Sequence, residues 1–96
     1  MKLEWSPAAF ADRDAIFDFI DSDSSRSAIS VDEAIEAKAN QLIDFPEIGR
    51  VGRVDGTREL VLTSLPYILV YAVQGDTALI LRVLHGARQW PDDVSH

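Results

Sequence analysis

Four side chains near the end of the sequence have types that could do chemistry. Arg82, His85, Arg88 and Trp90 follow the apolar run Ala78-Leu79-Ile80-Leu81. Histidine has an ordinary pKa that suits proton transfer near neutral pH, and arginine keeps its positive charge at every physiological pH. Tryptophan beside arginine is the usual composition of an anchor in a protein interface. The cluster therefore predicts either a catalytic site or a binding surface.

The length and composition predict one soluble domain over residues 1–96. Apolar residues make up 47% of the chain and charged residues 26%, which is ordinary for a globular protein. The absence of cysteine excludes a disulfide frame and a thiolate nucleophile, and it is compatible with a reducing cytoplasm. The start of the chain lacks the apolar segment of a secretory signal, and no apolar run is long enough to span a bilayer. We expect a cytoplasmic protein that uses neither a membrane, nor a metal, nor a cofactor.

The net charge of −7 is unevenly distributed. Residues 1–48 hold four basic and eleven acidic side chains, whereas residues 49–96 hold five arginines and five acids. Broad contact with phosphate backbones depends on lysine and arginine, so the overall balance argues against it. A local positive site in the second half is compatible with these numbers.

The first half predicts a short strand and two helices. Leu3-Glu4-Trp5 alternates as a strand does, and Ser6-Pro7 is typical of a helix start, so we expect a helix over about 7–21. After the polar turn at 21–25, Ser30 and Glu33 form a capping-box pattern that predicts a second helix. That helix is expected to end at Phe45-Pro46.

The second half predicts three strands, at 58–63, 66–73 and 77–85, joined as an antiparallel meander. The runs at 67–73 and 78–81 are apolar at both alternating positions, so we expect both faces of the sheet to be covered. The helices would cover one face, and part of the other is left for something else, such as a partner protein. The predicted class is α+β, with the first strand at an edge or in the centre.

This order of elements resembles the RelE/ParE superfamily of bacterial toxins, over nearly the whole chain. Four patterns carry the resemblance, namely Ser6-Pro7-Ala8-Ala9 after the first strand, Phe45-Pro46-Glu47-Ile48-Gly49-Arg50, Thr57-Arg58-Glu59-Leu60 with Pro66-Tyr67-Ile68-Leu69-Val70-Tyr71, and Leu81-Arg82-Val83-Leu84-His85-Gly86-Ala87-Arg88-Gln89-Trp90. They look closer to ParE, the plasmid-stabilisation type, than to RelE. The resemblance implies the toxin of a type II toxin–antitoxin module, which a small cognate antitoxin neutralises.

The superfamily divides by mechanism, and the resemblance implies two alternatives. RelE-like toxins cut messenger RNA in the ribosome, whereas ParE-like toxins bind DNA gyrase and cause growth arrest without nuclease activity. RelE-like enzymes often carry an arginine next to the tyrosine of the pattern that begins here with Tyr67, and this chain has Ile68 at that position. An isoleucine neither donates a hydrogen bond nor holds a charge. We therefore expect a gyrase inhibitor rather than an enzyme, with the nuclease as the alternative and an inactive toxin as a third possibility.

If the chain is a nuclease, His85 is the candidate acid or base, and Arg82 with Arg88 or Arg58 would stabilise the phosphate. In the alternative interpretation, His85 ends a strand with its ring bonded to backbone, and the arginines pair with helix aspartates or with the antitoxin. Glu59 could act as a base only if it were desolvated, and we expect it to be solvated like most strand-edge glutamates.

The binding interpretation selects four residues that would face the antitoxin or the target. Arg50 and Arg53 lie in a glycine-rich loop, and Arg88 and Trp90 lie at the chain's end. Trp90 has a second interpretation, in which it covers the core as Trp5 is expected to do.

Overall fold

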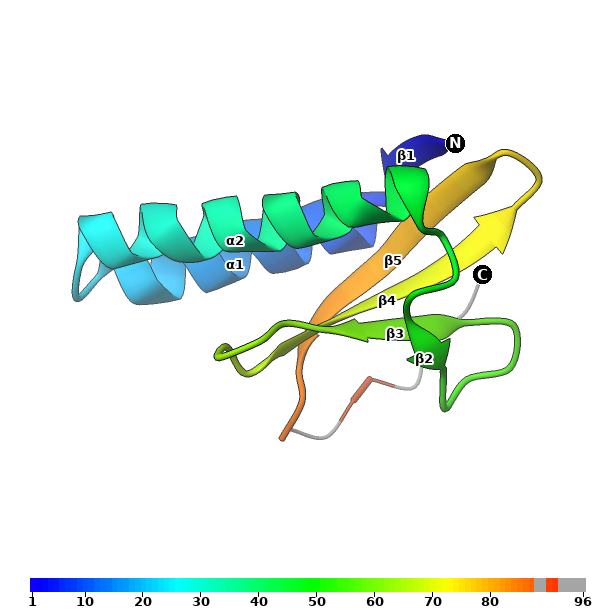
Figure 1. Cartoon of the computed structure of the whole chain (residues 1–96). Helices are drawn as coiled ribbons and strands as arrows, with labels where there is room; N and C mark the ends of the chain where they lie inside the picture. The colour runs from blue at the N-terminus through cyan, green and yellow to red at the C-terminus, as the bar shows by residue number, and fades with distance from the viewer. Residues whose placement is uncertain (88–89, 92–96) are drawn as a thin grey trace.

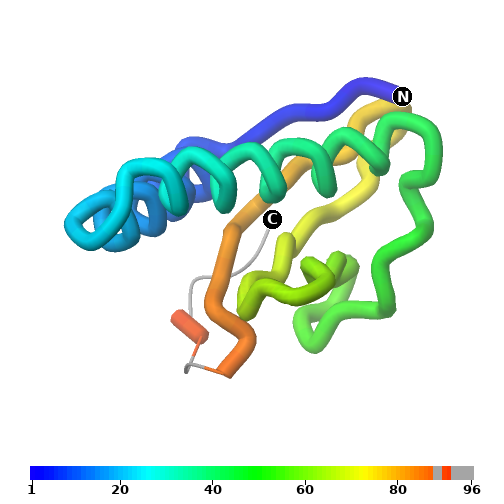
Figure 2. The backbone as a smooth tube through the Cα atoms, turned by 60° about the vertical axis from the view of Figure 1, so that its left-hand side comes forward, coloured from blue at the N-terminus to red at the C-terminus, as the bar shows by residue number. Residues whose placement is uncertain are grey.

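The computed structural model describes residues 1–87, 90 and 91, and it arranges them as a helical hairpin on one face of a five-stranded sheet. The elements are β1 (Lys2–Trp5), α1 (Pro7–Asp21), α2 (Ser25–Asp44), β2 (Arg50–Val51), β3 (Arg58–Val61), β4 (Tyr67–Gln74) and β5 (Thr77–His85). The two helices run side by side (Figure 1), and Figure 2 shows them on one side of the strands. The predicted α+β class and the order of helices and strands are confirmed.

Helix α1 begins as its sequence predicts. The Ser6 Oγ accepts a hydrogen bond from the Ala9 N–H at 3.0 Å, and Pro7 occupies the first turn, where its missing N–H costs nothing. Helix α2 ends at Asp44, just before the predicted stop at Phe45-Pro46. Among the described residues, no helix is both long enough and apolar enough to cross a bilayer.

The predicted start of α2 is wrong, because the helix begins at Ser25 rather than at a cap formed by Ser30. Ser24 has an extended backbone, and its Oγ accepts a hydrogen bond from the Ser27 N–H at 3.2 Å. The extra turn buries Ala28 completely against the rest of the molecule. Burial of that small side chain favours the earlier cap over the capping-box pattern at Ser30.

The sheet is mixed and has the order β1-β5-β4-β3-β2. Strands β3, β4 and β5 form the predicted antiparallel meander, and β1 pairs with β5 in parallel at one edge. This places the N-terminus beside the turn between β4 and β5 (Figure 1). Strand β2 was not predicted, since its two residues are too few to show an alternating pattern.

Strand β5 contains a β-bulge that the N-terminal region of the protein stabilises. Val70 pairs with Arg82 and Tyr71 with Ile80, so Leu81 has no partner in β4. The Leu81 carbonyl instead accepts a hydrogen bond from the Ser6 Oγ at 2.8 Å. A bulge leaves backbone groups outside the regular ladder, and here the residue that caps α1 supplies a replacement hydrogen bond.

The two faces of the sheet carry different clusters of side chains. The inner face packs on the helices and contains the main core, which includes Leu42, Leu69, Tyr71 and Ile80, all fully buried. On the outer face, Ile68 and Val70 form a smaller cluster. Half-buried side chains of the chain itself cover that cluster, namely Val54, Leu84 and Trp90. The structure thus identifies cover for the second face that does not require a partner.

Candidate functional site

Arg82 is tied to helix α1 by the carboxylate of Asp12. Its Nε donates to Oδ2 at 2.7 Å and its Nη2 donates to Oδ1 at 2.9 Å, with side-chain exposures of only 17% and 16%. The same Oδ2 accepts the Val83 N–H at 2.9 Å, next to the bulge. This is the pairing with a helix aspartate that the sequence analysis named as the alternative to catalysis.

His85 lies at the end of β5 and bonds to nearby backbone. Its Nδ1 accepts a hydrogen bond from the Ala87 N–H at 3.1 Å, so this nitrogen carries no proton in that arrangement. The ring packs edge-on against Tyr67, with 5.9 Å between the ring centroids. These two contacts give the imidazole a structural role at the end of β5.

Arg58 bonds to the connection between α2 and β2. Its Nη1 donates to the Gly49 carbonyl at 2.8 Å and more weakly to the Glu47 carbonyl at 3.4 Å. The strand register also separates the predicted catalytic set. Arg58 is opposite Tyr71, which faces the helices, whereas Arg82 is opposite Val70 on the outer face. The Arg58 guanidinium is bonded to the connection between α2 and β2, whereas the Arg82 guanidinium is bonded to Asp12 of α1, so the two groups are held by different parts of the molecule.

A pocket of about 360 Å³ lies between α1 and the end of β5. It is lined by Asp12, Ala15, Ile16, Phe19, Tyr67, Val83, Leu84, His85 and Trp90. Phe19 is 72% exposed at this pocket, and the Asp12 carboxylate there is already bonded to Arg82. The pocket is therefore mostly apolar. His85 also lines it, and the described residues show no ion pair for its ring.

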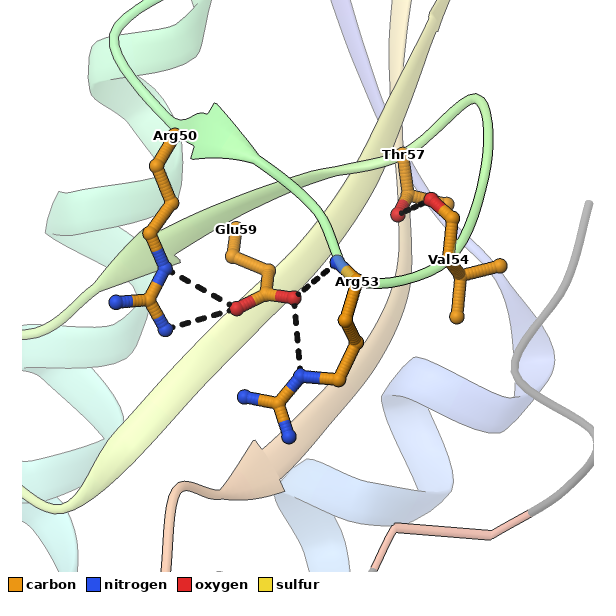
Figure 3. Close-up of polar contacts among 5 residues, drawn as sticks. All are labelled: Arg50, Arg53, Val54, Thr57 and Glu59. Carbon is orange, nitrogen blue, oxygen red and sulfur yellow. Dashed lines mark hydrogen bonds and ion pairs between the residues drawn. The ribbon is translucent and has the colours of Figure 1, made fainter.

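A second polar cluster joins β2, β3 and the loop that connects them (Figure 3). The Glu59 side chain is only 3% exposed and accepts four hydrogen bonds. Arg50 donates to Oε1 through Nε at 3.2 Å and Nη2 at 2.8 Å. Arg53 donates to Oε2 through its backbone N–H at 2.8 Å and its Nε at 3.2 Å. Both guanidinium groups remain about half exposed, at 56% and 49%.

The Glu59 carboxylate is held in its ionised form by these contacts. Burial alone would raise its pKa, but the hydrogen bonds from the Arg53 backbone and from both guanidinium groups outweigh burial, so the pKa lies below its ordinary value. The expectation that Glu59 is solvated is wrong, because its carboxylate is enclosed by two arginines. A base that is bonded four times to donors is a poor proton acceptor.

Trp90 packs against Ile68 and Val70, together with Val54. The guanidinium carbon of Arg53 lies 3.5 Å from the centroid of its ring, in cation–π contact. The Trp90 Nε1 is buried and has no hydrogen-bond partner among the described residues. Trp90 thus covers a local core, as its second interpretation stated.

The outer face is apolar at Ile68 and Val70, and its charged side chains gather around Glu59. Ile68 is 5% exposed and Val70 is fully buried. Arg88 falls outside the described residues. Within the described part of the chain, no group of three histidine, cysteine, aspartate or glutamate side chains is placed to hold a metal ion.

Sequence reasoning missed the Glu59 cluster for a physical reason. The carboxylate is enclosed by Arg50, which lies opposite it on β2, and by Arg53 in the following loop, and the two residues of β2 leave no periodic signal. One signal was present, since between residues 49 and 91 the five arginines face only three acids, which makes each acid a candidate for a shared ion pair.

Comparisons with known proteins agree on one family. The model of the family described as "ParE toxin of type II toxin-antitoxin system, parDE" matches residues 3–90. The toxin-designated protein Y4kP of Sinorhizobium fredii is 37% identical over 90 residues, which is 94% of this chain and 93% of that protein. Toxin RelE2 of Caulobacter vibrioides is 34% identical over 87 residues, 91% of this chain and 97% of that toxin. In the solved chromosomal ParDE toxin–antitoxin system of P. aeruginosa, one chain matches with a TM-score of 0.80 and 30% identity, over 88% of this chain and 95% of that one.

Proposed function

We propose that this chain, which belongs to the family of ParE toxins of type II toxin–antitoxin systems, acts by binding and inhibiting DNA gyrase and does not cut RNA. The family membership makes it the toxin of a two-component module with an antitoxin as partner. The gyrase target follows from the resemblance to ParE. Gyrase acts in the cytoplasm, so the proposal includes the cytoplasmic location that the sequence predicts.

The observation that carries the proposal is the state of the outer sheet face. Cleavage of RNA without a metal requires cationic donors around the scissile phosphate and a group that moves a proton. Here Ile68 and Val70 occupy the centre of that face, and Trp90 covers them. Arg82, which lies in the same cross-strand row as Val70, is bonded to Asp12. An apolar patch that the chain's own side chains cover argues against phosphate chemistry at Ile68 and Val70.

The alternative is a ribosome-dependent mRNA nuclease of the RelE type. One observation favours it, namely that His85 lines the pocket between α1 and β5 and is only half-buried. Its Nδ1 is occupied by the Ala87 N–H, which leaves Nε2 for proton transfer. Of the arginines named to accompany His85, Arg82 is bonded to Asp12 and Arg58 to the α2–β2 connection, and Arg88 lies outside the described residues.

The test uses the purified full-length chain, separated from its antitoxin and refolded, in two parallel assays. The first measures supercoiling of a relaxed plasmid by DNA gyrase, and the second measures cleavage of a message on programmed ribosomes. We expect supercoiling to fall in proportion to added toxin, to recover when the antitoxin is added, and the message to stay intact. Cleavage of the message with normal supercoiling would overturn the proposal.

A further inference from the structure

Glu59 holds the Arg50 and Arg53 side chains at one place on the surface although it can neutralise only one of them. The carboxylate is buried to 3% exposure, and its two oxygens are divided between the two arginines. Two positive charges therefore share one negative charge, which leaves a surplus of one positive charge at this point. On a chain with a net charge of −7, that surplus is unusual.

Both guanidinium groups keep donors that no described residue uses. A guanidinium has five N–H donors. Arg50 commits only Nε and one N–H of Nη2 to Glu59, and the Arg53 side chain commits only Nε. Figure 3 draws no contact to Glu59 from one terminal nitrogen of Arg50 and from both terminal nitrogens of Arg53. The side chains are 56% and 49% exposed, so these donors face solvent.

The pair is also fixed before any ligand arrives. Arg50 is held by its two bonds to Glu59, and Arg53 is held by its Nε bond and by the Trp90 ring, 3.5 Å from its guanidinium carbon. Holding long side chains in one place in advance lowers the entropy lost on binding. Two fixed guanidinium groups with open donors form a site for an oxyanion.

From this geometry we propose that Arg50 and Arg53, positioned by Glu59, bind a carboxylate of an acidic segment of the antitoxin. The inference rests on the proposed function, since the antitoxin is the partner that family membership brings. An apolar side chain beside the acid would fit the same surface. Val61 shares the outer face with Glu59 and is 43% exposed next to the buried Ile68.

The observations favour a carboxylate over a nucleic-acid phosphate. A nucleic-acid strand needs several cations along its path, and the overall charge of this chain repels a polyanion. Other arginines are already bonded within the molecule, with Arg13 on Asp32 and Arg82 on Asp12. One surplus charge matches one carboxylate.

The experiment measures antitoxin affinity by calorimetry for full-length variants. Arg50→Gln and Arg53→Gln are introduced together with Glu59→Gln, so that no buried carboxylate loses its partners and the variant keeps its fold. Arg26→Gln is the matched control, because Arg26 is exposed on α2. Its replacement changes the net charge of the protein by one, as the triple variant does. The binding of a 12-nucleotide single-stranded RNA is measured in parallel.

We expect the triple variant to bind the antitoxin about 10- to 100-fold more weakly, since two charge-assisted contacts are lost, whereas Arg26→Gln stays within about threefold. Raising the salt concentration should narrow the difference. An affinity of the folded triple variant within about threefold of the original would overturn the proposal. RNA binding that requires Arg50 and Arg53 would also overturn it, in favour of a phosphate site.

The measured antitoxin affinities do not depend on whether gyrase is the target of the toxin. If gyrase is not inhibited but antitoxin binding depends on the arginine pair, the gyrase proposal fails and the inference stands. If gyrase is inhibited and the pair is dispensable for the antitoxin, only the inference fails.

Discussion

The carboxylate of Asp12 and the guanidinium of Arg82 form a two-point ion pair, at 2.7 and 2.9 Å, that joins helix α1 to strand β5. The same carboxylate also accepts the Val83 N–H. A residue whose chemistry suggested phosphate binding therefore has a structural role that can be measured.

Replacing Asp12 by alanine should lower the free energy of unfolding by about 2–4 kcal/mol, because a mostly buried Arg82 loses its counter-charge and the Val83 N–H loses its acceptor. Urea denaturation followed by circular dichroism measures the change. Asp14→Ala is the matched control, since Asp14 lies exposed on the same helix. Equal stability of the two variants would show that the ion pair contributes nothing.

Replacing Tyr71 by phenylalanine should destabilise the fold by about 1–3 kcal/mol, because both hydrogen bonds of a buried side chain are lost together. The fully buried Tyr71 donates its hydroxyl to the Pro46 carbonyl at 2.7 Å and accepts the Gly49 N–H at 3.0 Å. The hydroxyl lies so near Gly49 that an added Cβ there would be 2.6 Å from it. Thermal unfolding provides the measurement.

Tyr67→Phe is the control for that change, since no hydrogen bond is found for the Tyr67 hydroxyl among the described residues. Equal melting temperatures for the Tyr71→Phe and Tyr67→Phe proteins would contradict a stabilising role for the two hydrogen bonds of Tyr71.

Replacing Glu59 by glutamine should remove a part of the stability that depends on pH. The pKa of Glu59 is lowered in the folded chain, so its contribution is present above the ordinary glutamate pKa, about 4.3, and is lost as the pH falls through the lower folded value. The stability difference between the original protein and the variant should therefore shrink from pH 7 to pH 3. Urea denaturation across that range tests this, with the exposed Glu33→Gln as control. A difference that is constant with pH would refute the ionised, arginine-bound state.

Replacing His85 by alanine should leave toxicity unchanged. The ring accepts only the exposed Ala87 N–H, which water can satisfy, and its packing on Tyr67 is at the surface end of β5. Growth arrest after induction, with antitoxin binding as a check of folding, measures the effect. Loss of toxicity by a variant that still binds antitoxin would assign His85 a catalytic role.

Much of the fold could be predicted because its signals are local. Ser6-Pro7 marks the start of α1 through the side-chain cap of Ser6 and the fixed backbone of Pro7, and the apolar run within 77–85 is long enough to indicate a strand. The start of α2 was misplaced because Ser24 and Ser30 both have cap chemistry, and the burial of Ala28 decided between them.

The candidate site was less predictable because it depends on pairings across the chain. Asp12 and Arg82 are 70 residues apart, and nothing in either neighbourhood indicates the other. Glu59 was expected at a solvated edge, but β2 pairs with β3 there and Arg50 and Arg53 enclose its carboxylate. The presence of Ile68 in place of an arginine, by contrast, could be interpreted from the sequence, since it depends on the chemistry of one side chain alone.

The most direct test of the central claim is to express the chain without its antitoxin and to follow new DNA, new protein and message integrity in the same culture by pulse labelling. Inhibition of gyrase predicts that DNA synthesis stops first while messages stay intact. Translation that stops first, with cut messages, would contradict the account.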